Sequence, residues 1–115
     1  MTSLISIFLG GGLGASLRWG TGLLAVGVLG RSWPGTLLVN ILGTAILCLF
    51  YKHRPNVSEQ VNQFLTIGLL GGLTTFSTFS YEVVQHFTRG ELKEGLLILL
   101  LNIGLGITVG IWILR

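Results

Sequence analysis

Charged residues are scarce in this sequence. Asp, Glu, Lys and Arg together make up 10% of its 115 residues, whereas a soluble domain is usually about 25% charged. So few charges cannot cover the water-exposed surface of a domain of this size, and the composition therefore argues against a soluble protein. Cysteine is scarce as well. Cys48 stands alone, so no disulfide can form within the chain.

Long apolar runs take the place of the missing charges. Half of the residues are hydrophobic, and the mean hydropathy is +0.81. A helix that spans a bilayer needs about 20 mostly apolar residues. Four such runs cover residues 4–29, 34–51, 61–85 and 92–114. We therefore predict an all-α membrane protein with four transmembrane helices, forming one domain over residues 1–115 in the cell (inner) membrane.

The residues between these runs predict where the helices begin and end. Pro34 is placed to start the second helix, residues 52–56 form the clearest loop, and Ser58 is a candidate N-cap for the next helix. Residues 88–91 form the other polar turn. The first run follows an N-terminus without basic side chains, so we read it as a retained helix and not as a signal peptide.

The net charge of +3 does not point to nucleic acid. The basic side chains lie at the ends of the apolar runs, where they reach the lipid headgroups. One face of the membrane would carry Lys52, Arg54 and Arg115, and the other Arg31, Arg89 and Lys93, with Arg18 if it reaches that surface. This near balance gives the positive-inside rule little bias to act on. Either one weak signal decides the orientation, or the chain inserts both ways and pairs antiparallel.

The third apolar run contains an unusually polar stretch, residues 71–82, with the sequence GGLTTFSTFSYE. Its hydroxyl residues cannot all face lipid cheaply, and its glycines and β-branched threonines weaken a helix. Irregular backbone at membrane depth is tolerated only where protein buries it or where it lines a wet cavity. We therefore expect a break in the third helix near Gly71–Thr74 and a polar path beside it.

Several other side chains fit such a path. Phe76 and Phe79 are three residues apart and share a helix face, and their ring edges carry partial positive charge that suits an anion. Asn40 and Asn102 place amide groups at membrane depth. Arg18 and Glu82 are ionisable groups near the spans, and such groups are functional candidates by default.

Together these segments are recognisable. Residues 10–18 (GGGLGASLR), 35–43 (GTLLVNILG) and 71–82 resemble the fluoride channel (Fluc/CrcB) family, and the resemblance covers essentially the whole chain. It implies a fluoride-selective channel that passes fluoride passively out of the cell and so lowers its toxicity. It also implies an antiparallel, dual-topology homodimer with two fluoride pores and a structural sodium ion (Na+) at its centre.

The resemblance also assigns roles to particular residues. Phe76 and Phe79 would line the pores, with Asn40, Ser77 and Thr78 as polar contacts. Glu82 would lie along the polar track and Arg18 near an aqueous vestibule. The backbone carbonyls of Gly71 and Thr74 from both subunits would hold the sodium ion.

The match is weakest in the fourth helix. Family members often carry a Tyr and, one turn later, a Ser on the pore side, where this chain has Asn102 and Gly106. Asn102 keeps a polar group in the anion path, whereas Gly106 offers no hydroxyl.

Three other classes of protein fit less well. A small dual-topology multidrug transporter needs a carboxylate in its first helix, and residues 4–29 contain neither Asp nor Glu. A non-conducting structural subunit would leave the hydroxyl-rich stretch without a purpose. We expect no enzyme, because His53 and His86 stand near helix ends without a metal-binding or triad pattern in the sequence.

Overall fold

The computed structural model describes residues 2–53 and 55–115, and within them every regular element is a helix. Three helices are long and apolar enough to cross a membrane: α1 (Thr2–Leu29), α2 (Trp33–His53) and the continuous run Leu92–Leu114. That last run consists of α6 (Leu92–Leu100), the π-helical segment η2 (Leu101–Leu105) and α7 (Gly106–Leu114). The chain is therefore an all-helical membrane protein.

The remaining apolar run is divided into shorter pieces. It begins with α3 (Glu59–Gln63) and continues through the π-helical segment η1 (Phe64–Leu70) into α4 (Gly71–Leu73). Two extended residues follow, and α5 (Phe76–Thr88) completes it. Ser58 caps α3 as the sequence predicts, because its side chain accepts a hydrogen bond from the Val61 amide.

The helix ends lie close to the predicted positions. Gly30 and Gly90 have φ values of 68° and 79° and turn the chain after α1 and α5. The second helix is longer than predicted, because Lys52 and His53 continue α2 instead of starting the loop. Lys52 is held there by a hydrogen bond from its Nζ to the Ile113 carbonyl of α7. Arg54, which enters the charge balance above, lies outside the described residues.

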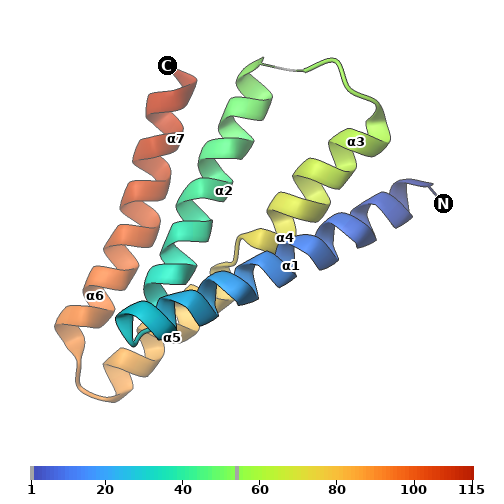
Figure 1. Ribbon diagram of the computed structural model, residues 1–115. Coiled ribbons are helices and arrows are strands. Elements are labelled where there is room, and N and C mark those ends of the chain that lie inside the picture. Colours follow the sequence, from blue (N-terminus) through green and yellow to red (C-terminus); the bar gives the residue numbers. More distant parts are fainter. Residues whose placement is uncertain (1, 54) are drawn as a thin grey trace.

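The helices form two groups that can be followed in Figure 1. Helix α1 packs along η1 and α4, while α2 lies against α7, with the C-terminus beside the end of α2. Helix α5 runs away from the break, then turns into α6 at the lower corner of the view. The two groups meet mainly where α1 packs against the start of α2, with Gly35 close to the Thr21 carbonyl. Helix α2 also contacts α5, in the region that carries the polar side chains.

Direct backbone contact holds α1 against η1 and α4. A Cβ atom on Gly72 would lie 2.6 Å from the Gly11 carbonyl oxygen, and one on Gly14 would collide with the backbone of Leu69 and Leu73. Small residues at these positions allow the helix axes to approach, which is how helices associate where lipid removes the hydrophobic driving force.

The hydrophobic core is small. Phe79, Val83 and Ile98 form its buried cluster, with Trp33 and Leu99 packed against it. Large apolar side chains cover the outside instead, and Phe8, Val28 and Trp112 are each more than three-quarters exposed. An apolar exterior of this kind matches a lipid environment.

Candidate functional site

The centre of the candidate site is the short extended segment between α4 and α5. Thr74 has φ −83° and ψ 154°, and Thr75 has φ −154° and ψ 123°, so neither residue is helical. Helix α5 starts at once after them, because the Thr75 hydroxyl accepts a hydrogen bond from the Thr78 amide at 3.1 Å. Thr75 therefore serves as the N-cap of α5, a role that Thr fills well.

Asn40 of α2 provides the hydrogen-bonding partners that this extended backbone requires. Its Oδ1 accepts from the Thr75 amide at 2.8 Å, and its Nδ2 donates to the Thr75 carbonyl at 3.0 Å. The same Nδ2 donates to Oδ1 of Asn102 at 2.9 Å. Asn102 in turn donates to the Ile98 carbonyl one turn earlier, at 3.0 Å. These bonds join α2, the extended segment and η2 through two side chains.

An open groove of about 560 Å³ lies beside these two amides. We call it the aromatic groove. Its lining includes Asn40, Thr44, Thr75, Phe76, Phe79 and Asn102. The two phenyl rings meet edge to face, with centroids 5.0 Å apart and planes at 89°. Phe79 is buried, whereas Phe76 is 75% exposed, so the Phe76 ring is accessible from the groove.

A second cavity, of about 510 Å³, has the ionisable groups in its wall. We call it the Glu82 cavity. Its lining includes Arg18, Ser32, Thr36, Thr78, Tyr81 and Glu82. Glu82 is 5% exposed, and its Oε1 accepts hydrogen bonds from the hydroxyls of Thr36 at 2.8 Å and Ser32 at 3.1 Å. Its buried Oε2 has no hydrogen-bond partner within residues 2–53 and 55–115.

The structure thus divides the predicted site residues between two places. Asn40, Phe76, Phe79 and Asn102 line the aromatic groove, and Gly106 lines it as well.

Arg18, Thr78 and Glu82 line the Glu82 cavity. Ser77 lies in neither lining; it is exposed, with its hydroxyl 3.3 Å from that of Thr75.

Sequence reasoning assigned no role to Ser32, Thr36, Thr44 and Thr75. Three of them follow the same spacing as Asn40, at intervals of four residues: Ser32 just before α2, then Thr36, Asn40 and Thr44 on it. Residues four apart on a helix are neighbours on one face. That spacing was the available signal, and it marks a polar stripe that runs from the Glu82 cavity to the aromatic groove.

A helical protein that is apolar outside and carries a stripe of hydroxyl and amide groups inside has the features of a membrane transport protein. Comparison with known proteins identifies the family. The model of the family described as "CrcB-like protein, Camphor Resistance (CrcB)" matches residues 5–113. The chain therefore belongs to the CrcB-like family.

Curated relatives carry the name fluoride-specific ion channel FluC. One from Clostridium perfringens (strain 13 / Type A) is 42% identical, over 84% of this chain and 78% of the relative. One from Chloroflexus aurantiacus (strain ATCC 29366) is 37% identical, over 92% of this chain and 96% of the relative. One from Shewanella halifaxensis is 38% identical, over 95% of this chain and 90% of the relative. The family is one of ion channels and not of enzymes.

Replacing Asn40 with Ala should destabilise the protein strongly. The change leaves the Thr75 amide and carbonyl without the partners they have in the structure, and each unsatisfied buried group costs about 1–3 kcal/mol. We expect the free energy of unfolding in detergent micelles to fall by about 2–4 kcal/mol.

The matched control is Thr44→Val, one turn further along α2. Within residues 2–53 and 55–115, the Thr44 hydroxyl bonds to the Asn40 carbonyl of its own helix, at 2.8 Å, and to no other group. Its loss should therefore cost less than about 1 kcal/mol. Equal losses in the two variants would show that Asn40 does not support the extended segment.

Proposed function

We propose that this protein is a fluoride-selective channel that passes fluoride passively out of the cell and so lowers its toxicity. Membership of the CrcB-like family and the names of the relatives support this proposal. The structural observation that carries it is the stripe of neutral donors on α2, which leads from the Glu82 cavity to the aromatic groove.

Neutral donors suit the chemistry of fluoride. The ion is small and tightly hydrated, so a pore must replace its water with other hydrogen-bond donors. Hydroxyls of Ser32, Thr36 and Thr44 and the amide of Asn40 would do this in succession, each exchanging its present acceptor within the protein for the passing ion. Because they carry no full charge, they would not trap the ion, and conduction needs binding that also permits release.

The aromatic pair would extend the path at the groove. The edge of a phenyl ring carries partial positive charge and attracts an anion weakly. Phe76 and Phe79 both line the groove, so an anion there would meet their rings beside the Asn40 and Asn102 amides. Gly106 adds no hydroxyl to this wall.

The ionisable groups would act at the other end of the path. Arg18 would draw anions into the Glu82 cavity, and Thr78 offers a hydroxyl in the same wall. Glu82 would hold the Ser32 and Thr36 hydroxyls in a fixed orientation, because both donate to its Oε1. Ser77 would contribute to the path at the exposed start of α5.

We further propose an antiparallel homodimer with two pores in the cell (inner) membrane. The aromatic groove is open along one side in the single chain, and large apolar side chains cover much of the exterior. A second copy would close the groove and bury part of that surface. The two membrane faces would carry nearly equal numbers of Lys and Arg residues, which suits a chain that inserts in both orientations.

We also propose a sodium ion between the subunits, beside the extended segment Thr74–Thr75. We interpret this segment as the break in the third membrane span. The donor that would serve the Gly71 carbonyl in a helix is the Thr75 amide, which bonds to Asn40 instead. The donor for the Thr74 carbonyl would be the Thr78 amide, which bonds to the Thr75 hydroxyl. Two carbonyls from each subunit would supply four oxygens, the ligand type that a small hard cation prefers.

The first test of function is fluoride efflux from proteoliposomes, followed with a fluoride electrode. The protein as it stands should release fluoride down its gradient without nucleotide or proton coupling, and should exclude chloride. Phe76→Ile and Phe79→Ile should each lower the fluoride flux by up to about tenfold, because each removes one ring of the edge-to-face pair.

Phe8→Ile is the control, because Phe8 lies on α1 and is 78% exposed on the outside. Its flux should equal that of the unchanged protein, and size exclusion should show that all variants are folded. Equal chloride and fluoride flux would overturn the proposed selectivity. Undiminished flux in both groove variants would leave Phe76 and Phe79 with a packing role only.

Dual topology is tested with a single cysteine at the end of α2. His53→Cys in a Cys48→Ser background should react with a membrane-impermeant maleimide from both sides of the cell membrane. Labelling from one side only would contradict the antiparallel homodimer and indicate a heterodimer with a separate, oppositely inserted partner.

The sodium proposal is tested by thermal unfolding of the purified protein. The melting temperature should be higher in sodium chloride than in N-methylglucamine chloride at the same ionic strength, because an ion that binds only the folded dimer stabilises it. Identical melting temperatures in the two salts would contradict a structural sodium ion.

A further inference from the structure

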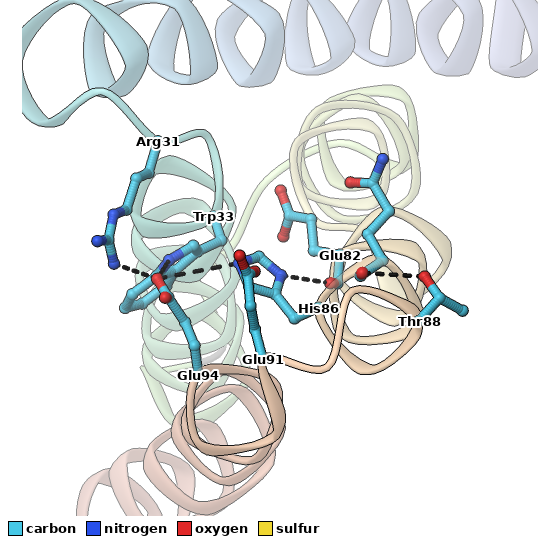
Figure 2. Close-up of polar contacts among 8 residues, drawn as sticks. Arg31, Trp33, Glu82, His86, Thr88, Glu91 and Glu94 are labelled. Carbon is cyan, nitrogen blue, oxygen red and sulfur yellow. Dashed lines mark hydrogen bonds and ion pairs between the residues drawn. The ribbon is translucent and has the colours of Figure 1, made fainter.

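A second group of potential ligands lies at the corner between α5 and α6, away from the two cavities. Gly90 turns the chain there, and the Glu91 amide donates to the His86 carbonyl at 2.8 Å. This turn brings Glu91 and Glu94 beside the His86 ring, as Figure 2 shows. In the sequence His86 appears isolated, because only the turn reveals which carboxylates face it.

The three side chains converge on one point. Nε2 of His86 lies 3.6 Å from Oε2 of Glu91 and 3.9 Å from Oε1 of Glu94. One ligand atom from each residue lies within 4.8 Å of the others. The His86 side chain is 15% exposed and that of Glu94 24%, so the group is partly shielded, whereas Glu91 at 49% leaves it open to solvent.

The orientation of the His86 ring is already set by the backbone. Its Nδ1 lies 2.7 Å from the carbonyl oxygen of Glu82 (Figure 2). A carbonyl only accepts, so Nδ1 carries a proton, and in the neutral ring Nε2 presents its lone pair to the two carboxylates. In that form the three acceptors face a common point, which suits a bound cation. A protonated ring would instead pair directly with the two carboxylates. Histidines that bind metals are commonly oriented by such a hydrogen bond at the other ring nitrogen.

We propose that His86, Glu91 and Glu94 bind a zinc ion. In a tetrahedral site with bonds of about 2.1 Å, neighbouring ligand atoms are about 3.4 Å apart. The two observed separations from His86 exceed this by only a few tenths of an ångström. The imidazole selects zinc or a similar transition metal over magnesium and calcium, which prefer oxygen ligands alone. Water would fill the fourth position.

Two residues at the start of α2 and just before it would tune this site. Glu94 accepts a hydrogen bond from Trp33 Nε1 at 3.0 Å and forms an ion pair with Arg31. Trp33 would orient the carboxylate, whereas the Arg31 guanidinium competes with the metal for its charge. The Arg31 side chain is 57% exposed, so it can move into solvent when the ion binds. Bound zinc would then tie the α5–α6 corner to α2.

The test is isothermal titration of the purified full-length protein in detergent with zinc chloride, which does not depend on fluoride conduction. We expect one zinc ion per chain. His86→Gln and Glu91→Gln should each weaken binding by about tenfold or more. His53→Gln is the matched control, because His53 is exposed at the end of α2, and it should bind as the unchanged protein does.

Arg31→Gln distinguishes a metal site from a structural charge cluster. Removing the competing cation should tighten zinc binding several-fold, while a purely structural ion pair would give no gain. Glu91 lies in the turn, so its variant keeps the test valid if His86→Gln fails to fold. Absence of saturable binding, or equal affinity in the His86, Glu91 and His53 variants, would overturn the proposal.

Discussion

The structure depends on one physical constraint, the need of every backbone polar group for a partner where water is excluded. The extended residues Thr74 and Thr75 lie within an apolar helical assembly, where an unsatisfied amide or carbonyl is costly. Asn40 meets this need because a side-chain amide has a donor and an acceptor in the arrangement of a peptide group. It therefore bonds both the amide and the carbonyl of Thr75.

The positions of the two cavities follow from that extended segment. Because α5 begins afresh at Phe76, with Thr75 as its N-cap, its first turns present aromatic side chains to one cavity and polar ones to the other. Phe79 lines the aromatic groove, while the neighbouring Thr78 lines the Glu82 cavity. The stripe on α2 connects the two, since its side chains repeat every four residues. A local departure from helical geometry thus accompanies two cavities, joined by a stripe of polar side chains, in a protein that is apolar outside.

The packing of α1 complements this arrangement. Backbone contact at Gly14 and Gly72 holds α1 firmly against η1 and α4. The aromatic groove lies elsewhere, between α2, the start of α5 and the η2–α7 segment. The buried cluster around Ile98 is small, so contacts with lipid or another subunit must supply stability that a soluble domain would obtain from its core. At the α5–α6 corner, Glu94 lies near His86 of α5 and accepts a hydrogen bond from Trp33 of α2, so it links the two helices.

The sequence by itself determined the membrane class, the approximate helix ends, the family and the importance of residues 71–82, because length, hydropathy and local composition are properties of contiguous segments. It also pointed to Asn40 and Asn102 as amides at membrane depth. Only the tertiary structure decided that Asn40 pairs with the Thr75 backbone, that the predicted residues separate into two cavities, and that Glu91 and Glu94 face His86. These outcomes rest on contacts between distant segments, and they depend on helix crossings and turn geometry that local sequence patterns do not encode.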